Sequence, residues 1–233
     1  MLDRRPAARF LAWTLGAVLV ACAAPPRPPG PAIPGPSPVA AMPGAVYEVT
    51  ASEVTVRVYR GGALAALGHN HVIASTALAG RIELREPLTA STLELALPLD
   101  SLTVDERPRR LAAGSDFPDN LTESDREGTR RNMLGPALLD AARFPVLRLT
   151  GVAIEGSAGE FRVRTQVALA GMEREILVPV GVDVRNRELV AQGEFVLTHA
   201  ELGLTPFSAA LGALRVRDDM LVAYRLVARR AGS

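Results

Sequence analysis

Phe161-Arg162-Val163-Arg164-Thr165-Gln166-Val167-Ala168-Leu169 alternates apolar and polar side chains with a period of two, and this pattern decides the fold class. In an extended chain alternate side chains share a face, so one set would face a core and the other set would face solvent. The stretch is typical of a half-buried β-strand.

Similar alternation recurs along the chain, in 47–49 with 53–59, and in 78–84, 92–99, 146–154, 176–184, 189–197 and 220–228. Gly, Pro and Asn signals separate these segments, which favours a mainly antiparallel β-protein, either a closed barrel or a sandwich. Periodicity alone does not choose between the two. One segment, 129–143, has apolar residues at three- and four-residue spacing, which predicts a helix that stops at Phe144-Pro145. The charged stretch 106–126 before it is expected to be a loop, either a solvated connection or a lid.

The charges of the chain nearly balance, with 26 Lys+Arg against 25 Asp+Glu among 233 residues. This gives no electrostatic case for nucleic acid as a partner. Aromatic residues make up only 4% of the chain, so we expect a core of Val, Leu, Ile and Ala. The length is ample for one domain.

The first residues have the features of an export signal, with Arg4, Arg5 and Arg9 ahead of a short apolar segment. Leu19-Val20-Ala21-Cys22 resembles a bacterial lipobox and contains the only cysteine of the chain. We therefore expect a lipoprotein signal peptide over 1–21 and lipidation of Cys22; an ordinary secretory signal is the alternative. With Cys22 lipidated, no thiol would remain for a disulfide or a metal site.

Ala23 to Gly44 is rich in Pro, Ala and Gly and cannot bury a core, so 22–44 is expected to form the lipidated residue and a tether. At about 3.1 Å per residue such a tether would reach on the order of 60 Å. The folded domain is expected to span 45–230. Ala23 after the cysteine favours the outer membrane, and we expect the domain to be periplasmic and lipid-anchored.

Two of the three histidines lie in Gly68-His69-Asn70-His71. In an extended segment His69 and His71 would point the same way. Three interpretations stay open: hydrogen-bonded polar groups in a partly buried turn, a metal or haem site, or part of the lining of a ligand pocket. If His199 approached the pair, three imidazoles would suit Zn or Cu.

Several separated segments together resemble the YceI-like family of periplasmic lipocalin-like barrels. The resemblance covers about 45–229 and rests on the order and spacing of these blocks: Gly68-His69-Asn70-His71-Val72-Ile73 leading to Leu78-Ala79-Gly80-Arg81-Ile82, Leu97-Pro98-Leu99-Asp100-Ser101-Leu102, Asn132-Met133-Leu134 through Arg143-Phe144-Pro145, Leu169-Ala170-Gly171, Gly193-Glu194-Phe195-Val196-Leu197 and Val216-Arg217-Asp218.

The resemblance implies an eight-stranded antiparallel barrel closed at one end by a short helix, with an elongated apolar cavity for a polyisoprenoid or other long amphiphilic lipid. A barrel of about eight strands can enclose one small ligand or be packed solid with side chains. The residues expected to line a cavity are Val56, Val58, Val163, Val167, Phe195 and Leu197, with His69 and His71 as further ligand-binding candidates.

The leading hypothesis is a membrane-tethered binding protein without a cofactor, and the alternative is a metal- or haem-linked protein that uses His69, His71 and His199. An enzyme is not expected. The clustered acids Asp116, Asp119, Glu123 and Asp125 lie in the predicted loop without the buried pairing that acid–base catalysis requires. The sequence does not predict an oligomeric state.

Overall fold

The computed structural model describes residues 44–157 and 160–232. The predicted signal peptide, Cys22 and the tether up to residue 43 lie outside the described residues. Within the described residues, no helix is long and apolar enough to cross a membrane.

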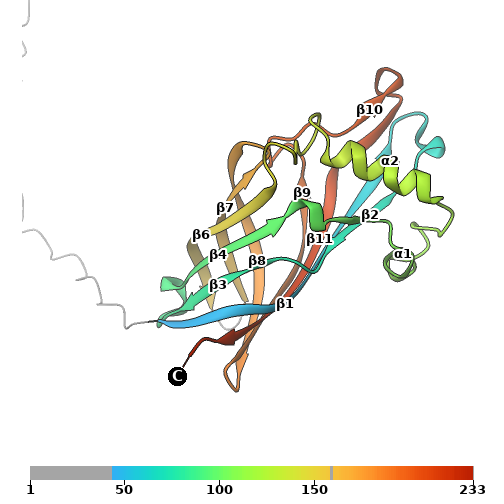
Figure 1. Cartoon of the computed structure of the whole chain (residues 1–233). Helices are drawn as coiled ribbons and strands as arrows, with labels where there is room; N and C mark the ends of the chain where they lie inside the picture. The colour runs from blue at the N-terminus through green and yellow to red at the C-terminus, as the bar shows by residue number, and fades with distance from the viewer. Residues whose placement is uncertain (1–43, 158–159, 233) are drawn as a thin grey trace, which may run out of the picture. The chain divides into compact units, whose positions relative to one another are not determined.

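Eight antiparallel strands form a closed barrel (Figure 1). Neighbours pair in the order β1, β3, β4, β6, β7, β8, β9 and β11, and β11 pairs with β1 to close the ring. The bounds are β1 Ala45–Gly61, β3 Ala79–Leu84, β4 Thr92–Pro98, β6 Val146–Ser157, β7 Glu160–Leu169, β8 Met172–Arg185, β9 Glu188–Thr198 and β11 Leu214–Arg230.

The long strand β1 shares one of its edges between two partners. Its first residues, Ala45 to Glu48, pair with β3, and Val54 to Val58 pair with β2 (His71–Ser75). The short strand β5 (Thr103–Val104) pairs antiparallel with the other edge of β2, and β10 (Ser208–Ala209) pairs with the start of β11. The structure therefore continues beyond the barrel at the end where β1 finishes and β11 begins.

The predicted fold class is confirmed. Each of the eight predicted segments lies in a barrel strand, and β7 alternates buried and exposed side chains along its length. Phe161, Val163, Thr165 and Val167 are buried, and the arginines between them are exposed. The period-two pattern was reliable here because each strand has one face inside the barrel and one in water.

The position of the helix differs from the expectation. The longer helix, α2, spans Glu123–Leu134, and the residues from 135 to 143 form turns. Thr122 begins α2 with a capping box: its side chain accepts a hydrogen bond from the Asp125 backbone, and the Asp125 side chain accepts one from the Thr122 backbone. Pro136 ends the helix early, because proline has no N–H and its ring clashes with the preceding turn.

The predicted loop 106–126 also contains structure. It holds α1 (Arg107–Ala113) and the first residues of α2. Pro108 lies in the first turn of α1, where its missing N–H costs no hydrogen bond.

Short 3₁₀ turns connect several strands: η1 Ala65–Leu67, η2 Leu88–Ala90, η3 Leu99–Ser101 and η4 Ala210–Gly212. Of these, η3 contacts α2. Arg130 of α2 donates hydrogen bonds to the carbonyl oxygens of Asp100 and Leu102, at 2.7 and 3.2 Å. These bonds attach the helix to the barrel wall.

The buried apolar residues form two clusters, one near each end of the barrel. At the α2 end, Met133 of α2 and Leu139 of the following turns pack with Val58, Leu197 and Met220. Helix α2 therefore caps this end. At the other end, the cluster contains Tyr47, Ile82, Leu189, Leu226 and Ala228.

Candidate functional site

A cavity of about 260 Å³ lies inside the barrel between the two core clusters. This volume is far above the roughly 10–15 Å³ that holds one water molecule, so the barrel is not packed solid. All eight barrel strands contribute to its wall, which is lined by Val54, Val56, Leu78, Ile82, Leu93, Leu95, Leu97, Leu99, Leu102, Leu139, Leu147, Leu149, Val163, Thr165, Val167, Leu169, Ile176, Val178, Val180, Ala191, Phe195, Leu197, Leu202, Met220, Val222, Tyr224 and Leu226.

The cavity is long and narrow. On β11 it is lined by every second residue from Met220 to Leu226, and at about 3.3 Å per residue this run covers roughly 20 Å. Two glycines allow close packing in the barrel wall. A side chain at Gly193 would collide with the Pro179 carbonyl at 2.4 Å, and one at Gly151 would meet Leu93 at 2.9 Å.

Only two of the lining side chains carry a polar group, and both groups are satisfied within the protein. The Tyr224 hydroxyl donates to the carbonyl of Pro179 at 2.8 Å, and the Thr165 hydroxyl donates to the carbonyl of Val163 at 3.1 Å. Burial raises the pKa of Tyr224 far above its usual value, so the phenol stays neutral. The lining therefore offers apolar contact, with no charged group to hold a charged ligand.

The structure places five of the six predicted apolar lining residues on the cavity wall: Val56, Val163, Val167, Phe195 and Leu197. Val58 is not among the lining residues. It is paired with Met220 and His71 near the capped end, and it is buried in the core cluster there. His69 and His71 are not among the lining residues of this cavity either.

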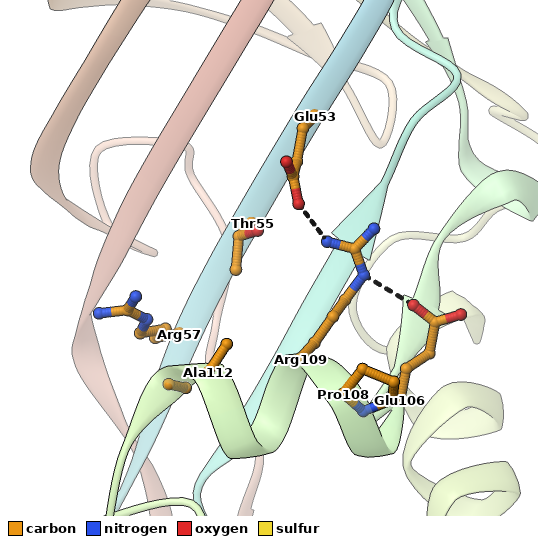
Figure 2. A pocket seen from close by; sticks show the side chains of 8 residues that line it. Glu53, Thr55, Arg57, Glu106, Pro108, Arg109 and Ala112 are labelled. Carbon is orange, nitrogen blue, oxygen red and sulfur yellow. Dashed lines mark hydrogen bonds and ion pairs between the residues drawn. The ribbon is translucent and has the colours of Figure 1, made fainter.

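A wider groove of about 570 Å³ lies outside the barrel, between β1 and α1 (Figure 2). Figure 2 shows Arg109 reaching between Glu53 of β1 and Glu106, at 2.6 and 2.7 Å. Burial opposes the charge of Arg109, but the hydrogen bonds to the two carboxylates outweigh it and raise the pKa. These charges already pair with one another, so the groove leaves none of them free to bind a charged ligand. We therefore regard the inner cavity as the candidate site.

His71 belongs to a buried polar network that holds α1 against β2. Its Nδ1 lies 2.6 Å from Asp105 Oδ2, and the other carboxylate oxygen accepts from the Val72 N–H at 2.9 Å and from Arg110 Nη1 at 2.6 Å. The side chains of Asp105 and Arg110 are both 0% exposed. Arg110 also donates to the carbonyls of Asn70 and Pro118. This guanidinium therefore ties together three segments of the chain.

Asp105 is held in its charged form. Burial alone would raise its pKa, but the hydrogen bonds from His71, Val72 and Arg110 and the charge of His71 outweigh burial and lower it. An ionised Asp105 requires a proton on Nδ1 of His71, because a carboxylate only accepts hydrogen bonds. The geometry thus favours the interpretation of His71 as a hydrogen-bonded structural group.

The three histidines are not gathered at one point in the described part of the chain. The rings of His69 and His71 lie 6.5 Å apart between centroids, and His69 is exposed. His199 is buried in the turn after β9, where its Nδ1 lies 2.8 Å from the Asp218 carbonyl. Across 44–157 and 160–232, no group of three or more His, Cys, Asp or Glu could hold a metal ion. The metal alternative therefore finds no support.

Asp119, Glu123 and Asp125 of the acidic segment have partners within the protein. Asp119 pairs with Arg107 at 2.7 Å and with Arg126 at 3.4 Å, while Asp125 caps α2. The hydrogen bonds with Thr122 lower the pKa of Asp125, although it is fully exposed. These acids stabilise the segment that carries α1 and α2.

Comparison with known proteins was informative at the level of structure. No protein-family model matches the sequence, and no curated protein matches it. Burkholderia cenocepacia BcnA aligns with a TM-score of 0.54 and 13% identity, covering 76% of this chain and 95% of its own. A polyisoprenoid binding domain from Saccharophagus degradans aligns with a TM-score of 0.51 and 15% identity, covering 81% and 99%.

The chain has the fold of these two proteins. The barrel that the YceI-like resemblance implied is thereby confirmed at the level of the fold. A Campylobacter jejuni YCEI protein aligns more weakly, with a TM-score of 0.47 and 8% identity over 66% of this chain and 82% of its own, and adds no argument.

Sequence reasoning missed most of the cavity wall and, apart from His71, the polar network. The lining residues of β4, β6 and β8 look like ordinary core residues, although the period-two pattern would have found their inward positions. Asp105 and Arg110 stand in a run of charged residues, Asp105-Glu106-Arg107-Pro108-Arg109-Arg110. No local signal marks which two of them are buried.

Proposed function

We propose that this protein is a binding protein that sequesters a polyisoprenoid or another long amphiphilic lipid, with the apolar chain inside the barrel. The observation that carries the proposal is the elongated cavity, whose wall offers 25 apolar residues together with Thr165 and Tyr224. Each CH₂ group moved from water into such a wall is favourable by about 0.8 kcal/mol. A long chain therefore needs few polar contacts.

The chemistry of the wall favours binding over catalysis. Its two hydroxyl groups are both hydrogen-bonded to backbone carbonyls, and the Tyr224 phenol is neutral. General acid–base catalysis requires a group that titrates near the working pH and reaches the substrate. We therefore propose that the protein binds its ligand in this cavity without a cofactor. The name of the Saccharophagus degradans domain, which shares the fold, supports an isoprenoid as the ligand class.

The N-terminal sequence supports a location for the barrel. We propose that the chain is exported, cleaved before Cys22 and anchored by lipids on that cysteine to the periplasmic side of a bacterial membrane, the outer membrane by the rule for Ala23. Metabolic labelling with a fatty acid should label the chain. A Cys22→Ala variant should lose the label, and retention of it would refute the anchor.

The binding proposal is tested by native mass spectrometry of the barrel from Ala45 onward, exported to a bacterial periplasm and purified without detergent. A bound mass of several hundred daltons that moves into organic solvent is the expected result. A bare barrel, with no lipid bound after incubation with a polyisoprenyl phosphate, would refute the proposal.

Two neighbouring residues of β8 provide a matched pair of variants. Val178 lines the cavity, and Leu177 beside it points outward and is 47% exposed. Val178→Trp should fill the cavity and abolish lipid binding, whereas Leu177→Trp should bind as the parent does. Trp13, the only tryptophan, lies in the predicted signal, so each new indole is also a single fluorophore. Equal binding by both variants would place the lipid elsewhere.

A further inference from the structure

Two neighbouring hairpins at the capped end of the barrel carry a cluster of exposed apolar side chains. Leu64 and Leu67 lie in the loop from β1 to β2, and Phe207 and Leu211 lie in the hairpin of β10 and β11. Nine large apolar side chains are exposed in the described part of the chain, and four of the nine lie in these two hairpins. We call Leu64, Leu67, Phe207 and Leu211 the apolar tip.

The two hairpins are held together, so the apolar tip is one surface. The Leu64 N–H donates to the carbonyl of Ala213 at 2.7 Å. A side chain at Gly62 would collide with the same carbonyl at 2.3 Å, and one at Gly68 would touch Leu214 at 3.0 Å. In Figure 1 the loop after β1 and the β10 hairpin lie side by side at the end where α2 covers the barrel.

The backbone of the tip holds an apolar residue out into solvent. Ala210, Leu211 and Gly212 have φ values of 49°, 57° and 88°, and Leu211 is fully exposed. Residues other than glycine rarely adopt this left-handed conformation. Because Leu211 is exposed, packing of its side chain does not offset the energetic cost of this backbone conformation. Backbone strain of this kind is often associated with a function of the residue.

The two chain segments that carry the apolar tip contain arginines and no acidic residue. No Asp or Glu occurs from Arg60 to Asn70 or from Thr205 to Arg217. Arg60 donates to the carbonyl of Gly68 at 2.7 Å. Arg215 lies opposite Gly61 where β11 pairs with the end of β1, and Arg217 is paired with Asp219.

We propose that the apolar tip docks the barrel on an anionic lipid bilayer, with Leu64, Leu67, Phe207 and Leu211 inserted among the lipids and Arg60 and Arg215 against the headgroups. Leucine and phenylalanine side chains next to arginines fit the boundary between the headgroups and the acyl chains of a bilayer. The tip protrudes as two hairpins, which suits insertion into lipid better than the packed pocket typical of a protein partner. The inference goes beyond the proposed function, because docking does not require a ligand in the cavity.

A single fluorescent label tests the docking. In the mature chain expected from residue 22 onward, with Cys22→Ser, one new cysteine carries an environment-sensitive dye, either at the tip (Leu67→Cys) or at the far end of the barrel (Arg185→Cys). Arg185 is 80% exposed and lies at the end of β8. With vesicles of phosphatidylglycerol and phosphatidylcholine we expect a blue shift of the dye at residue 67 and none at residue 185.

Variants that keep the label at residue 67 separate the two contributions. Leu211→Ser should weaken partition into the vesicles on the order of tenfold, the value of one buried leucine. Arg60→Gln and Arg215→Gln should each weaken it about fivefold on anionic vesicles and have little effect on neutral ones.

Three results would overturn the inference. The first is no shift at residue 67, or an equal shift at residue 185. The second is an equal shift on neutral vesicles, which would remove the role of the arginines. The third is a shift that grows with protein concentration in the absence of vesicles, which would make a second copy of the chain the occupant of the tip. Native mass spectrometry of the cavity ligand is independent of all three, so the failure of one proposal is distinguishable from the failure of the other.

Discussion

The polar network around Arg110 makes a sharp prediction about stability. Arg110 is fully buried, and it pairs with the equally buried Asp105 at 2.6 Å while donating to the carbonyls of Asn70 and Pro118. Arg110→Met keeps much of the side-chain volume but leaves Asp105 buried without its arginine. Breaking a buried ion pair on one side costs about 3–5 kcal/mol. For a chain of this size that corresponds to a fall of about 6–20 °C in Tm.

The residue before it is the matched control. Arg109 lies on the same helix, is 23% exposed and pairs with Glu53 and Glu106. Surface ion pairs contribute about 0–1 kcal/mol, so Arg109→Met should cost less than about 1 kcal/mol. Arg110→Lys should lie between the two variants, because lysine keeps the charge but not the planar fork of donors.

The assay is urea unfolding followed by circular dichroism, with the free energy of unfolding taken from the midpoint and the slope. The double variant Asp105→Asn with Arg110→Met should be less unstable than the sum of the single variants, because no unpaired charge remains buried. If Arg110→Met costs no more than Arg109→Met, the network does not hold α1 against β2 and the reasoning is refuted.

Three further predictions concern pH, the α2 cap and a hairpin turn. The pKa of Asp105 is lower in the folded state than its unfolded value of about 3.9, so its contribution to stability is fully present above that value. The contribution is lost as pH falls through the folded-state pKa. In urea unfolding between about pH 5 and pH 2, Asp105→Asn should therefore flatten the pH dependence of the free energy of unfolding. Thr122→Ala should lower the free energy of unfolding by about 0.5–2 kcal/mol through loss of the α2 cap, whereas Ser124→Ala, two residues on, should have little effect; equal costs would contradict the cap. Gly171→Ala should cost more than about 1 kcal/mol, because φ is 75° there and the new side chain would lie 2.5 Å from Phe144, while Ala170→Gly at φ 50° should be neutral or stabilising by calorimetry.

The barrel could be predicted from the sequence because every strand has one dry face and one wet face. The alternation around Val163, Thr165 and Val167 is a direct consequence of that geometry. The end of α2 was harder to predict, because Leu138 and Ala141 continue the helical spacing of apolar residues beyond Gly135-Pro136. The helix nevertheless ends at Leu134, because the proline that follows cannot continue it. In this segment the effect of Pro136 on the backbone outweighs the apolar spacing that follows it.

The candidate site was only partly predictable for a different reason. A wall of valine and leucine has the same sequence pattern whether the interior is empty or filled, so the choice of Val56 and Val163 could be made, but the existence of the cavity could not. The histidines attracted attention because His-x-His is rare and polar, yet His71 is bound to Asp105, which lies 34 residues further along the chain. That pairing depends on how the chain folds back on itself, which single-sequence reasoning does not reach.

The volume of the cavity sets an energetic cost that a bound apolar chain would offset. An apolar void destabilises a protein by about 24 cal/mol per Å³, so a cavity of about 260 Å³ corresponds to a cost on the order of 6 kcal/mol. That is comparable with the whole stability of many domains, about 5–15 kcal/mol. Larger side chains at a few inward positions, such as Val178 or Ala191, would remove the void and its cost. A chain that keeps small residues there gains most when an apolar molecule fills the space, and bound lipid should then raise the unfolding temperature as its concentration exceeds Kd.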